Sequence, residues 1–445
     1  MNHTEEMIRN LETEKTEQLL TWLYGAGEDV LEKQKARYEA LIRRHAEIFG
    51  EKPDLQLVSA PGRTEIGGNH TDHNNGRVLA AAVNLDALCA VSPRKDMTVR
   101  FHSEGYDPIE MDLSDLSVHP EEEGTTKALI RGVAAGMQQN GYSIGGFDAA
   151  VTSTVAGGSG LSSSAALEVM LTGVFDSLYN HFDMPYVLRA QISQMAENKY
   201  FGKPSGLLDQ MASAAGGLVT VDFRDTNKPE VEPISYDFAR RGYALVVVAT
   251  GGSHANLTDQ YAAIPAEMKQ VASCFGKQVL RGVTAEQLTA ALTMLRQTVS
   301  DRAIMRAVHF IQENDRVPEQ VSALKEDRID DFLQLIIDSG RSSYMYLQNV
   351  FADNRDQSLS LALCLAEMLL KGRGAWRIHG GGFAGTTLNF VPADLVESFV
   401  DVMSRAFGEK SCFVLNIRPV GAARIELRIK KQNFTCTRIT GRTGL

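Results

Sequence analysis

Apolar and polar positions follow two different periods along the chain. In residues 1–50, apolar side chains from Leu19 to Ile48 recur three or four positions apart with charged residues between them, which predicts amphipathic helices. Gly25 and Gly27 divide this stretch into two predicted helices, and Gly50 is suited to end the second. We therefore expect an N-terminal helical extension over residues 1–50, packed as a cap on its own lobe rather than serving as an oligomer contact or regulatory element.

After residue 50 the period shortens, and short apolar or alternating runs bounded by turn residues predict strands. Strand-like and helix-like stretches mix without the regular alternation of a Rossmann fold, which indicates an α+β fold. The polar stretch 224–241 predicts a boundary between an N-terminal lobe, 51–230, and a C-terminal lobe, 231–445. The predicted strands are 56–60, 78–83, 87–91, 149–155, 218–223, 243–249, 385–391, 412–417 and 423–429, and the predicted helical stretches are 165–178, most of 262–351, and 357–370.

Composition and charge narrow the class of protein. The chain has 445 residues, 44% hydrophobic and 22% charged, which is typical of a folded globular protein with two or three domains. A net charge of −10 argues against nucleic-acid or membrane partners held by a general basic field. The charged N-terminus, the short apolar runs and five scattered cysteines predict a cytoplasmic protein with reduced thiols. We expect a monomer or weak homodimer.

A glycine-serine loop between a predicted strand and a predicted helix, residues 155–166, is a candidate phosphate site. Glycines allow close approach of the backbone, and free N–H groups at the positive end of a helix can surround a phosphate. The loop lacks the G-K-[ST] of a Walker A motif and the second glycine of a G-x-S-x-G nucleophile elbow. A flexible turn that ends in a serine helix cap is the alternative.

A second glycine-rich loop, residues 61–76, gathers polar side chains after a strand. Arg63, Asn69, His70, Asp72 and His73 could together bind a polyhydroxylated ligand, because carboxylate and amide groups hydrogen-bond to vicinal hydroxyls. A metal site on His70, Asp72 and His73 is the alternative.

Two further segments carry candidate chemistry. Asp209 follows a Pro-Ser-Gly turn at a predicted helix start, where a carboxylate is also favoured by the helix dipole alone. Residues 380–385 contain four glycines, which indicates either tight backbone packing or one wall of a phosphate site.

The order of these four segments resembles the galactokinase branch of the GHMP kinases, a superfamily of small-molecule kinases that includes homoserine, mevalonate and phosphomevalonate kinases. The family pattern P-G-R-V-N-L-I-G-E-H-T-D-Y-N resembles Pro61–Asn74, the phosphate loop G-L-S-S-S-A is present as Gly160–Ala165, and G-G-G-F-G-G resembles Gly380–Gly385. Ala196-Glu197 and Leu208–Met211 resemble the A-E-H and M-D-Q-M stretches, and Arg306–His309 resembles the R-A-x-H of galactokinases.

The resemblance implies a two-lobed kinase with its active site between the lobes, which transfers a phosphoryl group from MgATP to the C1 hydroxyl of a sugar, galactose first of all. Asp209 would be the catalytic base, with Arg63 beside it. ATP and Mg²⁺ are the implied cofactors. By the same resemblance, the sugar would bind Asn69, His70, Asp72 and Tyr261, the phosphates Gly157, Gly158, Ser159, Gly160, Leu161, Ser162 and Ser163, and the metal Ser164 and Glu197.

Departures from the family pattern lie on the sugar side. The family glutamate that accepts from the sugar's C6 hydroxyl is Asn69, the following tyrosine is His73, and Thr64-Glu65 stand for Val-Asn. Ile264-Pro265 replace two arginines after the pocket tyrosine. An amide at 69 would no longer repel a C6 carboxylate, so a kinase for a modified galactose such as galacturonate is one alternative. A non-catalytic sugar and ATP sensor is another, although the phosphate loop keeps Ser164-Ala165.

Overall fold

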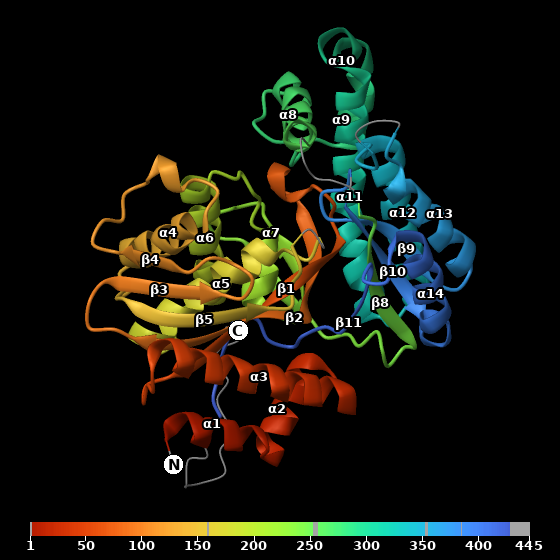
Figure 1. Ribbon diagram of the computed structural model, residues 1–445. Coiled ribbons are helices and arrows are strands. Elements are labelled where there is room, and N and C mark those ends of the chain that lie inside the picture. The colour runs from red at the N-terminus through yellow and green to blue at the C-terminus, as the bar shows by residue number, and fades with distance from the viewer. Residues whose placement is uncertain (1, 158–159, 252–256, 352–354, 384, 428–445) are drawn as a thin grey trace.

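A computed structural model describes residues 2–157, 160–251, 257–351, 355–383 and 385–427 (Figure 1). The first and larger sheet follows the order β12-β1-β2-β5-β3-β4, with β6 on β2 and β7 on β6. All pairs are antiparallel except β3 with β5. The strands are β1 (Gln56–Gly67), β2 (Arg77–Pro93), β3 (Thr98–Ser103), β4 (Ile109–Asp112), β5 (Phe147–Ser153), β6 (Leu218–Asp222), β7 (Glu230–Ile234) and β12 (Ala423–Ile425).

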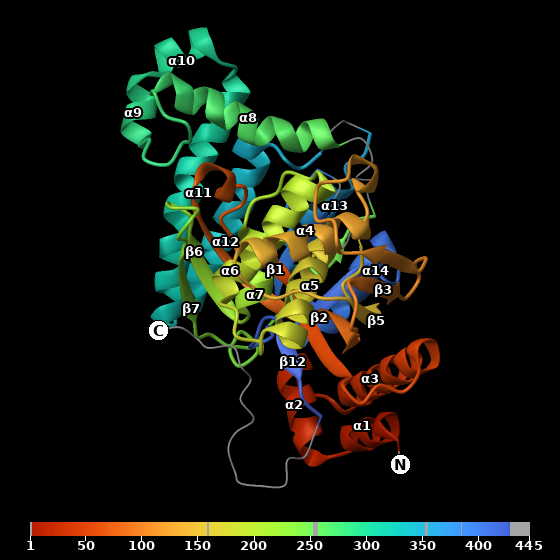
Figure 2. The ribbon, with the colours of Figure 1, turned by 90° about the vertical axis from the view of Figure 1, so that its left-hand side faces the viewer.

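Helices cover both faces of this sheet, which explains why β1 is buried along almost its whole length. On one face lie α4 (Thr126–Gln139), α5 (Ser163–Tyr179), α6 (Tyr186–Ala196) and α7 (Leu208–Ala215). The opposite face carries the N-terminal helices α1 (His3–Leu11), α2 (Glu14–Tyr24) and α3 (Glu28–Phe49), seen below the sheet in Figure 1 and again in Figure 2.

The prediction of two N-terminal helices was wrong, because this segment forms three. The break that the sequence pattern concealed lies at Thr13, whose side chain accepts from the Thr16 amide and caps α2. The N-terminal helical extension itself is confirmed, and it packs on the sheet as expected for a cap on its own lobe.

A buried ionic cluster fastens the extension to the sheet. Asp86 of β2 accepts from Arg37 of α3 at 2.6 Å, from the Tyr24 hydroxyl of α2 at 2.7 Å and from Arg418 at 3.0 Å. The side chains of Asp86 and Arg418 are fully buried. Burial opposes ionisation of Asp86, but the two arginines lower its pKa to about 2.

The second sheet has the order β11-β8-β10-β9 and is antiparallel throughout. Its strands are β8 (Tyr243–Ala249), β9 (Ala375–His379), β10 (Thr386–Pro392) and β11 (Cys412–Leu415), and its neighbours include α12 (Ile329–Ser342), α13 (Ser358–Leu370) and α14 (Val396–Phe407). The remaining helices are α8 (Thr258–Cys274), α9 (Ala285–Ala290), α10 (Leu292–Thr298) and α11 (Asp301–Lys325). Short helical turns occur at Asp72–Asn74, Pro120–Glu122, Glu197–Phe201, Ser343–Leu347 and Ala393–Leu395.

The C-terminal half of the chain contributes to the first sheet. The predicted boundary at 230/231 falls inside β7, which belongs to the first sheet, and β12 returns to that sheet from the far end of the chain. The largest hydrophobic cluster joins both sheets, since it contains Val58 of β1 together with Val247 of β8 and Phe390 of β10. The α+β fold class is confirmed, and side chains of both sheets pack into one hydrophobic cluster.

Candidate active site

Three sequence motifs meet at Arg63, near the middle of β1. Its Nε donates to Asp209 Oδ1 at 2.7 Å, and its Nη1 donates to the Gly160 carbonyl at 2.5 Å. The Arg63 amide also donates to the Leu161 carbonyl at 3.0 Å. One guanidinium therefore connects the glycine-serine loop to the first turn of α7. The Arg63 side chain is buried, while that of Asp209 is 31% exposed and accessible to a ligand.

Ser162 completes the environment of Asp209. Its hydroxyl donates to Asp209 Oδ2, a contact that the sequence did not predict, because Ser162 was assigned to phosphate through its amide. Burial alone would raise the pKa of Asp209, but Arg63 and Ser162 together hold it below its ordinary value. The carboxylate is consequently ionised at neutral pH and able to accept a proton.

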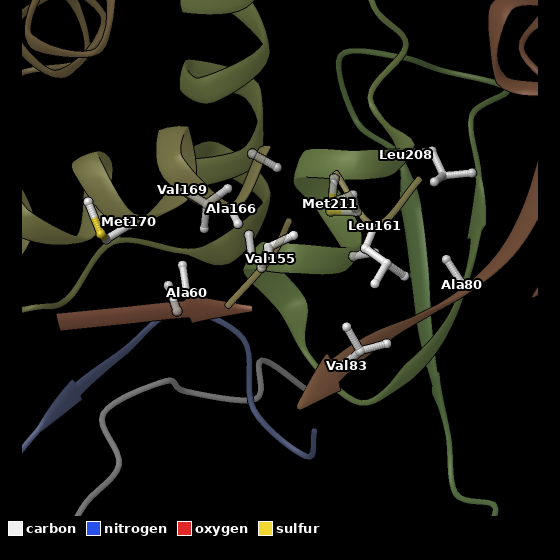
Figure 3. Packing of buried hydrophobic residues seen from close by; sticks show 14 of the residues in the cluster. Ala60, Ala80, Val83, Val155, Leu161, Ala166, Val169, Met170, Leu208 and Met211 are labelled. Carbon is white, nitrogen blue, oxygen red and sulfur yellow. The ribbon is translucent and has the colours of Figure 1, made fainter. Parts of the chain in front are cut away.

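Apolar packing fixes the two helix starts that carry this site. Figure 3 shows Leu161 beside Met211 of α7. Val155, which precedes the loop, and Val169 of α5 belong to the same cluster. Leu161 has no exposed surface and its carbonyl accepts from the Arg63 amide, so this residue anchors the loop to the core. A Cβ at Gly62 would lie 2.7 Å from the Leu161 carbonyl oxygen, and only glycine permits the observed approach of β1 to the loop.

The rest of the predicted phosphate loop leads into α5. Gly157 is exposed, Gly160 has a left-handed φ of +70°, and Ser163 is the first residue of α5. Gly158 and Ser159 lie outside the described residues. The amides of this helix start have no side-chain cap from Ser162, and the helix dipole favours an anion there. The assignment of these amides to ATP phosphates stays a prediction.

The two predicted metal ligands, Ser164 and Glu197, are in contact. Ser164 Oγ donates to Glu197 Oε1 at 3.1 Å, and Lys203 Nζ lies 2.7 Å from the same oxygen. The other oxygen, Oε2, accepts from Ser205 Oγ at 2.5 Å and from Gln210 Nε2 at 2.8 Å. The donor set of carboxylate and hydroxyl oxygens suits Mg²⁺, a hard cation that takes its remaining ligands from phosphates and water.

A second carboxyl group lies behind Glu197. Glu168, one helical turn after Ser164 on α5, is fully buried and accepts from Gln210 at 3.0 Å. Burial first, and the neighbouring Glu197 second, raise its pKa well above the ordinary value. Glu168 was not predicted from the sequence, although its four-residue spacing from Ser164 on a mostly apolar helix was a usable signal.

Successive carbonyls of the 380–385 glycine motif bind three of the four predicted sugar ligands. Asn69 Nδ2 donates to the Gly380 carbonyl at 2.7 Å, and the Tyr261 hydroxyl donates to the Gly382 carbonyl at 3.0 Å. His70 Nε2 lies 3.2 Å from the Gly381 carbonyl oxygen. Burial, and then His73, lower the pKa of His70 to about 3, so its ring is neutral and Nε2 carries the hydrogen. The motif thus aligns side chains of the two lobes.

The Asn69 side chain is fully buried and its hydrogen-bonding capacity is filled. Its amide nitrogen also donates to Glu65 at 2.9 Å, and its oxygen accepts from Ser343 and Asn349 at 3.1 Å each. Glu65 in turn accepts from the buried Arg377 at 2.6 Å. A direct contact between Asn69 and a sugar therefore requires one of these bonds to break.

Asp72, the fourth predicted sugar ligand, lies close to the catalytic segment. A Cβ at Gly206 would overlap the Asp72 carboxylate, so the loop before Asp209 packs directly against it. The alternative metal site is not supported, because the described residues contain no group of three or more His, Cys, Asp or Glu side chains placed to hold a metal ion. His73 instead donates its amide to Asp72 at 3.0 Å.

His309 of α11 shows what the predicted R-A-x-H segment does. Its Nε2 lies 2.9 Å from the Asn69 carbonyl oxygen and its Nδ1 lies 2.9 Å from Ser342 Oγ, with the ring fully buried. The histidine therefore positions the backbone of the sugar-side loop without reaching the reacting groups.

Fold and site together define a GHMP kinase, an enzyme that transfers a phosphoryl group to an alcohol. The N-terminal domain of the GHMP kinases matches residues 128–217, and the galactokinase galactose-binding signature matches residues 43–93. Over 389 residues the chain is 34% identical to a galactokinase of Streptomyces coelicolor, which aligns 86% of this chain with 96% of that protein. The chain belongs to the galactokinase family.

Solved structures agree with this assignment. Lactococcus lactis galactokinase complexed with galactose superposes with a TM-score of 0.75 at 25% identity, over 86% of this chain and 98% of that one. The mevalonate kinase of Methanococcus jannaschii shares the fold, with a TM-score of 0.59 at 14% identity over 82% and 99% of the two chains. The predicted family, fold, phosphotransferase activity and use of ATP are confirmed.

No helix among the described residues is long and apolar enough to cross a bilayer.

Proposed function

We propose that this sugar 1-kinase converts galactose and ATP to galactose 1-phosphate and ADP, with Asp209 as the catalytic base. The observation that carries the proposal is the contact of Arg63 with both Asp209 and the Gly160 carbonyl. It brings an ionised carboxylate and the phosphate loop to one point. Similarity to the Streptomyces coelicolor and Lactococcus lactis galactokinases supports galactose as the sugar.

In the proposed reaction Asp209 accepts the proton of the C1 hydroxyl as that oxygen attacks the γ-phosphorus of ATP. Arg63 keeps the carboxylate ionised and offsets negative charge that develops on the transferred group. The amides of Gly157–Ser163 orient the phosphates, and positioning of this kind supplies much of the rate of phosphoryl transfer. Mg²⁺, bound by Ser164 and Glu197, would neutralise phosphate charge.

On the sugar side, we assign hydroxyl recognition to His70, Asp72 and Tyr261. Since His70 Nε2 is committed to the Gly381 carbonyl, its Nδ1 is the atom that accepts from a sugar hydroxyl. Asn69 stands in the family's glutamate position, but its bonds to Glu65, Ser343, Asn349 and Gly380 favour a positioning role. The monomeric or weakly dimeric state, the cytoplasmic location and the absence of nucleic-acid and membrane partners remain predictions from the sequence.

A sugar panel with coupled detection of ADP tests the proposal. Galactose should give the highest kcat/KM, and release of sugar 1-phosphate rather than another phosphate ester should be seen by phosphorus NMR. No sugar-dependent ADP release across the panel, with sugar binding intact, would instead support the non-catalytic sensor.

Galacturonate is the second candidate substrate, and Asn69 is the specific observation in its favour. With an amide at this position, the carboxylate of the motif is Glu65, which is paired with Arg377 at 2.6 Å. The C6 end of the sugar would then meet no unpaired carboxylate. Turnover of galacturonate at least comparable to galactose would establish this alternative, whereas strict preference for galactose would exclude it.

A further inference from the structure

Lys203 holds the position that a metal ion would need at Glu197. Its Nζ lies 2.7 Å from Glu197 Oε1, the same oxygen that Ser164 contacts. With Ser205 and Gln210 on Oε2, the Glu197 carboxylate has two hydrogen-bond donors on each oxygen. A carboxylate has about four lone-pair sites, and Glu197 therefore has none left over.

The two partners differ sharply in exposure. The Glu197 side chain is 2% exposed and the Lys203 side chain 55%. Glu197 is held from both sides by neutral donors of α5 and α7, whereas the lysine extends from a loop just after Gly202, whose φ is +83°. The carboxylate is thus the fixed member of the pair and the ammonium the movable one. A buried carboxylate requires a compensating positive charge, and Lys203 supplies it.

Mg²⁺ and an ammonium group bind the same carboxylate oxygen in mutually exclusive ways, because both approach its lone pairs and repel each other at contact distance. We propose that Lys203 is a resident counter-ion of the metal site and that a divalent cation must displace it from Glu197. This inference rests on the proposed assignment of Ser164 and Glu197 to Mg²⁺. It adds a residue that weakens metal binding and keeps the site neutralised between turnovers.

The expected size of the effect follows from simple competition. The apparent dissociation constant of the metal is multiplied by one plus the equilibrium constant of the ion pair, and a half-exposed pair of this kind gives a factor of about three to ten. Removing the charge of Lys203 should therefore strengthen binding of a divalent cation by that factor.

Binding of Mn²⁺ to the full-length, nucleotide-free protein, followed by EPR of the free ion, measures this directly. Lys203→Met removes the charge and keeps the chain length, and Lys203→Arg keeps the charge. Lys199→Met is the matched control, because Lys199 is an exposed lysine on the same turn as Glu197. We expect three- to tenfold tighter Mn²⁺ binding in Lys203→Met, and values within twofold of the parent protein in the other two variants.

A thermal-shift series with MgCl2 gives a second readout. The rise in Tm on adding Mg²⁺ should be larger in Lys203→Met than in the parent protein, because its Glu197 carboxylate lacks a counter-ion until the metal binds. This comparison also shows whether the variant is folded.

Glu197→Gln separates the two hypotheses. If it weakens Mn²⁺ binding while Lys203→Met leaves it unchanged or weaker, the metal site stands and the role of Lys203 is overturned. If Glu197→Gln binds Mn²⁺ like the parent protein, the assignment of Glu197 as a metal ligand is wrong. The proposed competition between Lys203 and the metal is then wrong as well. Equal strengthening by Lys199→Met would reduce the effect to net charge and would also overturn the proposal.

Discussion

The Asn69 amide donates to the Glu65 carboxylate at 2.9 Å. In the family pattern the amide stands at the position of residue 65 and the carboxylate at that of residue 69, so this chain has exchanged the two groups. The structure explains why the exchange is tolerated, since the two side chains are neighbours and one carboxylate remains for Arg377. The site therefore keeps one negative charge, which lies on residue 65 here instead of on residue 69.

The exchange predicts strong coupling between the two positions. Asn69→Glu alone places two carboxylates in one buried site, and Glu65→Asn alone leaves Arg377 without its partner, so each should lower the free energy of unfolding by about 2–5 kcal/mol. The double variant restores one amide and one carboxylate and should recover about 1–3 kcal/mol of the summed loss. Urea unfolding of the four proteins measures this, and strict additivity would contradict it.

Asp209→Asn should abolish most turnover while leaving nucleotide binding intact. The amide is nearly isosteric but accepts no proton, and loss of a general base costs about a factor of 10² to 10⁴ in rate. Coupled ADP release gives kcat, and titration with ATP gives the binding constant. Full activity in this variant would remove Asp209 from the proposed role.

Arg63 should set the acid limb of the pH–rate profile. The guanidinium lowers the pKa of Asp209, so in the parent enzyme this group stays ionised below its ordinary range as pH falls. In Arg63→Ala the ionised form of Asp209 loses this stabilisation, so the pKa of Asp209 should rise and the fall in kcat/KM should move to higher pH. Superimposable profiles, apart from overall rate, would refute this assignment.

Asp86 should contribute to stability in a pH-dependent way. Its pKa is lowered to about 2 in the folded protein, so its contribution is fully present above the unfolded value near 4 and is lost as pH falls through the folded value. Asp86→Asn should cost about 3–5 kcal/mol at pH 7, because Arg37 and Arg418 lose their buried partner.

Urea unfolding between pH 7 and the lowest pH at which the protein stays folded measures this contribution. The difference between Asp86→Asn and the parent protein should shrink toward low pH. Asp54→Asn, at an exposed carboxylate, is the control that should show almost no difference. A gap that stays constant with pH would mean that Asp86 is not the titrating group.

Local sequence determined the elements and the identity of the site. The strand runs became β1, β2, β5, β6, β8 and β10, because their apolar side chains are buried on one or both faces of a sheet. The glycine-serine loop and the Pro-Gly-Arg motif could be recognised since they must place backbone atoms close together, which few residues permit. Helix boundaries were harder to predict where a polar side chain caps the helix, as Thr13 does at the start of α2.

Tertiary structure alone decided which partners those residues have. The contact of Arg63 with Asp209 spans 146 positions and that of Asn69 with Gly380 spans 311, and no periodic pattern in the sequence encodes such pairs. The sequence also does not encode the ion pair of Lys203 with Glu197 or the filled hydrogen bonds of Asn69. Burial and competition for lone pairs arise only when separate segments pack together. Sequence thus determined the reaction type through local motifs, while the packed structure determined which of their side chains are accessible to substrate and metal.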